Sequence, residues 1–122
     1  MFSLTYDSLW NMVTLSGKPE DFLHLATEIR RNQPSNVGAL RSDDPSTLLG
    51  IAIIPAKEPS ARISVDGRQL VIASQGTPGE LLATNIARVS TYKPGEHTHH
   101  EYFEDHPFLS RDSVPLVLGN IG

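Results

Sequence analysis

The spacing of apolar residues changes along the first thirty positions of the chain. Residues 2–6 and 10–15 are β-prone runs around a turn and predict two strands. Trp10, near the start of the second run, is expected to anchor the core or a sheet edge. From Pro19 onward the spacing becomes helical, and this proline suits the first position of a helix. The residues that form one apolar stripe at i, i+3, i+4 and i+7 are Phe22, Leu25, Ala26 and Ile29.

The second half of the chain repeats this order more clearly. Residues 62–74 form a hairpin signal, with Asp66-Gly67 between two β-prone runs, and this pair tolerates the positive φ angles of a type I′ turn. A helix is then expected with Thr77 as its N-cap, Pro78 at its first position and Glu80 closing a capping box. Each half therefore begins strand, strand, helix.

Further strands follow each helix. The first half offers residues 48–55, and the second offers 97–103 and then 113–118. The two helices also share similar sequences, LATEI at 25–29 and LATNI at 82–86, although five similar residues are too few to establish a duplication. We predict an α+β fold with a mostly antiparallel sheet, two helices on one face, and two strand–strand–helix–strand halves that share the one sheet.

The segment between the first helix and the next strand is polar. Residues 30–47 are rich in Pro, Gly, Ser and Asp, and we expect a long surface loop there. At 122 residues the chain is long enough for one hydrophobic core, so we predict a single domain over residues 1–122.

Composition excludes several classes of function. The formal net charge is −4 and no basic patch is interleaved with aromatic residues, so nucleic-acid binding is not expected. The chain has no cysteine, which excludes disulfides, thiolate nucleophiles and Cys-type zinc sites. No apolar run is long enough for a membrane helix and no signal peptide is predicted, so we expect a cytoplasmic protein without a membrane partner.

Four of the five histidines lie between Gly95 and Phe108. One hypothesis is that this segment forms a metal site. In a strand, His97, His99 and Glu101 would point to one face, and imidazoles with a carboxylate can bind zinc, nickel or iron. The segment partly resembles the metal-binding pattern of cupins, in which a glycine precedes His-x-His and a glutamate follows. It differs from that pattern in the spacing of its glycines and in the absence of a second histidine motif. A small metal-binding protein or hydrolase that uses these three residues is thus the alternative hypothesis, and no cofactor is predicted in the leading one.

Enzyme motifs are absent from the rest of the chain. There is no Gly-x-Ser-x-Gly turn, no Gly-x-x-x-x-Gly-Lys loop and no Gly-x-Gly-x-x-Gly loop. We therefore predict that the protein is not an enzyme. A third alternative is a self-associating structural module with its acidic strand at a sheet edge.

The same segment also has the composition of a binding surface. Between positions 96 and 112 there are five acidic residues and one basic residue, and aromatic residues lie among them. Aromatic side chains carry much of the binding energy in protein interfaces, whereas charges steer association. The candidate partner-binding residues are Tyr102, Glu101, Glu104, Asp105, His99 and Phe108.

The second half of the chain resembles a family of small bacterial immunity proteins of polymorphic toxin systems. The resemblance includes the Asp-Gly hairpin, the helix with a Pro/Glu start, and a long closing segment. The matching residues of that segment are His97, His99, Glu101, Tyr102, Phe103, His106, Pro107, Phe108, Leu109, Ser113, Pro115, Leu116 and Val117. The resemblance implies a non-catalytic antidote that binds a cognate toxin domain and blocks its active site. It implies no role for residues 30–47 and leaves the oligomeric state open.

Overall fold

The computed structural model describes all residues from Met1 to Gly122 and has the predicted α+β fold. The elements of the first half are β1 (Ser3–Asp7), β2 (Met12–Gly17), α1 (Pro19–Arg30), β3 (Ser35–Gly38) and β4 (Gly50–Pro55). Those of the second half are β5 (Ser60–Asp66), β6 (Gln69–Gln75), α2 (Gly76–Arg88), a single 3-10 turn η1 (Val89–Thr91), β7 (His97–His100) and β8 (Leu116–Asn120). Each half thus runs strand, strand, helix, strand, strand.

The two halves are interleaved in two four-stranded sheets. One sheet has the order β1-β2-β8-β7, and the other has the order β3-β4-β6-β5. Each sheet therefore combines the hairpin of one half with the last two strands of the other half. The central pairs β2–β8 and β4–β6 are parallel, whereas the outer pairs are antiparallel. The prediction of mostly antiparallel pairing and two helices is confirmed, but the prediction of a single sheet is wrong.

Individual backbone hydrogen bonds repeat between the halves. The N–H of Leu40 donates to the carbonyl of Phe2 at 2.8 Å, and in the second half the N–H of Ser110 donates to that of Ala61 at 2.8 Å. The segments that follow β3 and β7 thus cover the outer edges of β1 and β5 in the same way. This agreement supports an internal duplication far more strongly than the short sequence similarity of the helices does.

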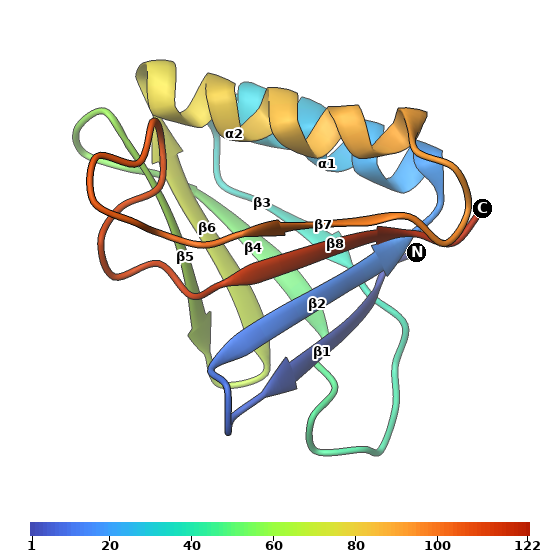
Figure 1. The fold of residues 1–122 in the computed structure, drawn as a ribbon. Helices are drawn as coiled ribbons and strands as arrows, with labels where there is room; N and C mark the ends of the chain where they lie inside the picture. The colour runs from blue at the N-terminus through green and yellow to red at the C-terminus, as the bar shows by residue number, and fades with distance from the viewer.

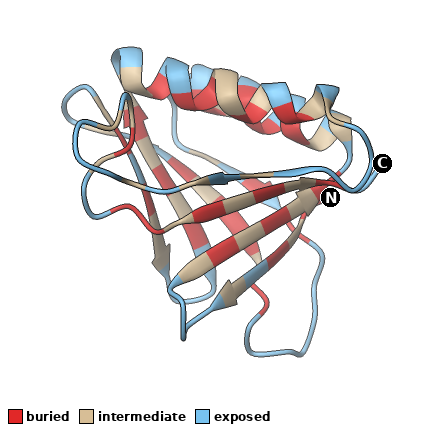
Figure 2. Cartoon of the chain, viewed as in Figure 1, coloured by how far each residue is buried: buried red, intermediate tan, exposed pale blue.

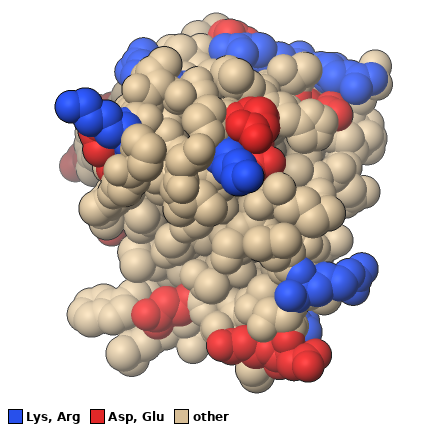
Figure 3. Space-filling view, turned by 90° about the vertical axis from the view of Figure 1, so that its right-hand side faces the viewer, with Lys and Arg blue, Asp and Glu red and all other residues tan.

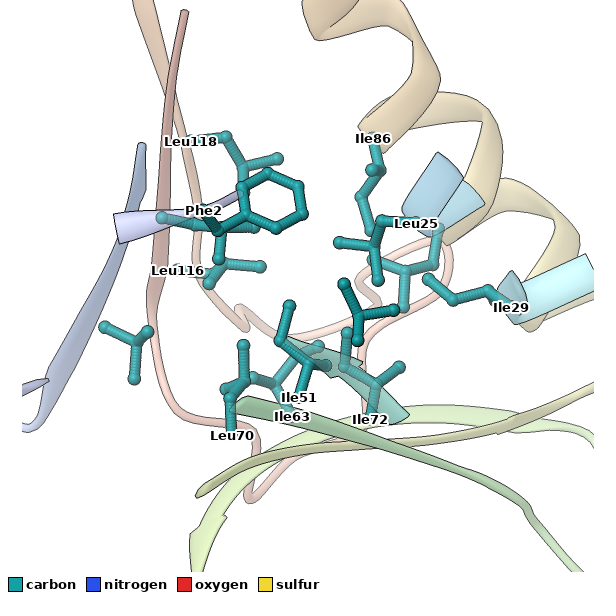
Figure 4. Close-up of a cluster of buried hydrophobic side chains, with 14 of the residues drawn as sticks. Phe2, Leu25, Ile29, Ile51, Ile63, Leu70, Ile72, Ile86, Leu116 and Leu118 are labelled. Atoms are coloured by element: carbon teal, nitrogen blue, oxygen red, sulfur yellow. The ribbon is translucent and has the colours of Figure 1, made fainter. Parts of the chain in front are cut away.

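The hydrophobic core lies between the two sheets and beneath the two helices. The helices pack against each other, and their buried faces point toward the inner faces of both sheets (Figure 1). Figure 4 shows Leu25 and Ile86 of the helices opposite Leu118 of one sheet and Ile72 of the other. Buried positions alternate along the strands and follow one side of each helix (Figure 2), as the apolar spacing of the sequence predicts.

Three local predictions are wrong. The segment 30–47 is not simply a loop, because it contains β3, and its residues Ala39 and Thr47 pair with Phe2 and with Thr5 of β1. In the β5–β6 turn only Gly67 has a positive φ, of 60°, whereas a type I′ turn needs two such residues. The N-cap of α2 is Gln75, which makes no side-chain capping bond, so the predicted capping box around Thr77 is not formed.

Candidate functional site

Strand β7 carries its histidines alternately on the two faces of its sheet. Thr98 and His100 pair with buried leucines of β8 and point to the core side, whereas His97 and His99 are exposed on the outer side. The rings of His97 and His99 are 5.4 Å apart, in an edge-to-face arrangement. β7 lies at the end of its sheet and pairs only with β8.

The alternative metal site is not assembled. No three His, Asp or Glu side chains lie close enough together to hold a metal ion. Glu101, the third member of the predicted set, follows β7 and is exposed in a non-strand segment. The geometry therefore does not support a metal centre at His97, His99 and Glu101.

The residues from Glu101 to Phe108 form a loop, here named the 101–108 loop, that is held at both ends. Before it, β7 pairs with β8; after it, Leu109 forms a parallel bridge to Ala61 of β5. The predicted strand 97–103 therefore ends at His100. The loop connects the edge of one sheet to the edge of the other, which restricts its conformation without burying its tip.

His106 organises the inside of this loop. Its Nδ1 atom accepts hydrogen bonds from the backbone N–H groups of Phe108, at 3.1 Å, and Leu109, at 2.9 Å. Its ring centroid lies 4.6 Å from that of Phe103 and 4.7 Å from that of Phe108, and Tyr102 stacks at 6.5 Å. One imidazole thus positions three aromatic side chains and two backbone donors.

His106 within the loop and His100 just before it favour the neutral state. Burial lowers the pKa of His100 below its ordinary value of 6.5, and the nearby imidazoles of His106 and His99 lower it further. Burial also lowers the pKa of His106. The Nε2 atom of His100 is buried and has no hydrogen-bond partner, so a proton there would have no acceptor to stabilise it.

The outer side of the loop is acidic and aromatic. Glu101, Glu104 and Asp105 are exposed, and none of them takes part in an ion pair. Phe103 lies among them and is 59% exposed. Asp105 has a φ of 61° in the turn closed by the hydrogen bond from the N–H of His106 to the carbonyl of Phe103, a conformation that aspartate tolerates better than most residues. The turn therefore directs unpaired carboxylates and a phenyl ring to solvent.

Trp10 also lies at this surface, which was not predicted from the sequence. Trp10 is 71% exposed in the β1–β2 turn and is not the core or edge anchor that we predicted. It lines an open cavity of about 290 Å³ together with Met12, Pro115 and Glu101. The signal that could have identified it is its place between Asp7 and Asn11, in a polar hairpin turn. The acidic loop and this exposed tryptophan therefore meet at Glu101.

The predicted contact residues fall into separate environments. Glu101, Glu104, Asp105 and His99 are exposed, whereas Tyr102 and Phe108 are half-buried around His106. Phe108 packs against the hydrophobic core, so its main contacts are within the protein.

On the face that looks to the right in Figure 1, acidic and basic side chains are interspersed and no broad basic area is visible (Figure 3).

In comparisons with known proteins, no family model, no curated protein and no solved structure matches the chain. Neither helix has the length and apolarity that a membrane crossing needs.

Proposed function

We propose that this protein is a non-catalytic immunity protein that binds a cognate toxin domain through the 101–108 loop and blocks that domain's active site. The observation that supports this most strongly is the group of three unpaired carboxylates, Glu101, Glu104 and Asp105, around the exposed ring of Phe103. Charged groups without an internal partner cost little to bring to a cationic surface, and they steer its approach.

The proposed contact surface combines this loop with Trp10. Exposed aromatic rings supply large apolar area at a small entropy cost, and they are the commonest centres of binding energy in interfaces. Because the loop is fixed by His106 and by both sheet edges, little conformational entropy is lost when it binds. The proposed mechanism is occlusion: the carboxylates occupy sites that bind a negatively charged substrate, such as the phosphates of a nucleic acid.

Co-expression with the product of the neighbouring gene, where the proposal expects the toxin domain to be encoded, tests the proposal. We expect the wild-type protein to co-purify with that domain and to restore growth of cells that express it. The double variant Glu101→Lys/Glu104→Lys should lose both effects, because it repels a cationic surface. Asp43→Lys is the control, since Asp43 is exposed in the loop between β3 and β4, and this loop lies on the right in Figure 1 whereas the 101–108 loop lies on the left.

Two results would refute the proposal. One is that the wild-type protein neither co-purifies with the toxin domain nor restores growth. The other is that the Glu101→Lys/Glu104→Lys variant binds and protects as well as the wild type does, which would place the interface elsewhere on the molecule.

A further inference from the structure

The two similar halves differ sharply at two equivalent positions. In the first half, the rings of Phe2 and Phe22 are fully buried and lie 5.1 Å apart, edge to face. In the second half, the equivalent residues are Ala61 and Gly79. The equivalence follows from the matched hydrogen bonds to Phe2 and Ala61 and from the aligned sequences of α1 and α2.

A polar cavity lies beside Gly79 in the second half. This cavity of about 120 Å³ lies between the end of α1 and the beginning of α2. It is lined by Arg30, Asn32, Ser74 and the first turn of α2, and only one of its lining residues is hydrophobic. Its volume is several times the roughly 30 Å³ that a water molecule takes up in the liquid. No cavity is lined by Phe22 or Gly17, the residues of the first half that correspond to Gly79 and Ser74, so the fold itself does not require this cavity.

Ser74 is the side chain that indicates a ligand. The residue is only 4% exposed, and its hydroxyl takes part in none of the side-chain hydrogen bonds of the protein. The hydroxyl faces the first turn of α2, because a Cβ atom added to Gly79 would lie 3.0 Å from Ser74 Oγ. The hydroxyl oxygen is not one of the fully enclosed polar atoms that lack a partner, so it opens onto the cavity and can bond a group that enters it.

Several of the other polar groups around the cavity are hydrogen-bond donors, although the amides of Asn32 and Gln75 can also accept. The N–H groups of Gly76 and Thr77 at the positive end of α2 have no partners within the helix, Pro78 has no N–H group, and Gln75 provides no side-chain cap. Arg30 donates through Nε to Glu80 at 3.0 Å and through Nη2 to Thr84 at 3.2 Å, which leaves Nη1 without a hydrogen bond in the protein. Glu80, whose side chain is 58% exposed, is the one negative group on the rim.

We propose that this cavity binds a small oxyanion group, a phosphate or a carboxylate, held by the Ser74 hydroxyl, the first turn of α2 and Arg30. The site is independent of the 101–108 loop and of the toxin-binding function. Helix N-termini bind such groups through backbone N–H donors and the helix dipole, and arginine adds a charge-assisted bond.

Titration of ¹⁵N-labelled protein with inorganic phosphate near neutral pH, at constant ionic strength kept with NaCl, tests this site. We expect saturable shifts of the backbone amide signals of Gly76, Thr77 and Gly79. Arg30→Gln and Ser74→Ala should each weaken binding at least about tenfold, since each removes a direct donor. Arg88→Gln, the same charge change at an exposed residue of the last turn of α2, is the control and should change the affinity less than about twofold.

A parallel titration with acetate separates the two chemical sources of the oxyanion. Saturation by phosphate alone indicates a phosphate-bearing ligand, and saturation by acetate alone indicates a carboxylate. Ser74→Ala should leave the thermal midpoint unchanged or raise it, because the hydroxyl has no partner to lose, so weakened binding there cannot be ascribed to unfolding. If neither anion gives a saturable response, or if Arg30→Gln binds both as the wild type does, the proposed site is wrong.

Discussion

The Nδ1 atom of His106 accepts a hydrogen bond of 2.9 Å from the backbone N–H of Leu109, the residue at which the 101–108 loop joins the edge of β5. The same atom also accepts the N–H of Phe108, so two backbone donors depend on one imidazole. This contact connects the conformation of the proposed binding loop to the edge of the second sheet.

Removing this acceptor should loosen the loop and lower the stability of the protein. We expect His106→Ala to reduce the free energy of unfolding by about 1–2 kcal/mol, because it leaves two backbone donors without partners and removes ring contacts. His106→Asn offers a side-chain oxygen and should lose less. Denaturant unfolding measures both values. Equal stability of the wild type and His106→Ala would show that the imidazole does not hold the loop.

Acidification should destabilise the protein as the pH falls below about 6.5. The pKa values of His100 and His106 are lowered in the folded state, so the unfolded chain binds more protons than the folded one below the ordinary value of 6.5. The stability that these neutral imidazoles contribute is complete above that value and is lost as the pH falls toward their folded pKa values. Denaturant unfolding at about pH 8 and about pH 5.5 measures the change. The double variant His100→Val/His106→Asn should show a smaller change between the two pH values.

Replacing His100 by the residue at its equivalent position should stabilise the fold. Val37 and His100 both face the core and pair with the equivalent strands β4 and β8, and only the histidine leaves a buried Nε2 atom without a partner. We expect His100→Val to raise the free energy of unfolding near neutral pH by about 1 kcal/mol, since an unsatisfied buried polar group is removed. A lower free energy of unfolding for His100→Val would contradict this prediction and would show that the imidazole makes a stabilising contact.

Two glycines should differ in their tolerance of alanine. A Cβ atom on Gly17 would lie 2.6 Å from Cδ1 of Phe2, a ring that is 1% exposed and packed against Phe22. On Gly119 the nearest atom, Cβ of His97, would be 3.8 Å away. We expect Gly17→Ala to cost roughly 1–3 kcal/mol through overpacking and Gly119→Ala to cost much less. Thermal unfolding of the pair measures the difference, and similar costs would contradict the packing described.

The local periodicity of the sequence predicts the elements better than it predicts their assembly. The stripe that includes Leu25 and Ile29 identified α1, and the β-prone runs around Asp66 identified a hairpin, because these patterns depend on neighbouring residues alone. The division into two sheets depends on pairs such as Val13 with Leu116, more than a hundred positions apart, whose register no local pattern specifies. The short strand β3 was missed because its sequence, SNVG, is that of a turn.

The candidate site was predicted by composition and corrected by geometry. The acidic and aromatic character of the segment after β7 was visible in the sequence, and the exposure of Glu101 and Glu104 agrees with it. Which aromatic ring is exposed was not predictable, because it depends on the turn at Asp105 and on the packing of His106. Trp10 joins the same surface only through the pairing of β2 with β8, which brings the first hairpin beside the last strand.

The measurement that tests the central claim most directly is the dissociation constant of the proposed complex between this protein and a toxin domain encoded by a neighbouring gene. It is taken for the wild type, Phe103→Ala and Asp43→Lys in low and high NaCl. We predict that Phe103→Ala weakens binding at least about tenfold, that Asp43→Lys leaves it nearly unchanged, and that added NaCl weakens the wild-type complex by slowing its association. Wild-type affinity for Phe103→Ala together with no dependence on NaCl would contradict the assignment of the 101–108 loop as the binding surface.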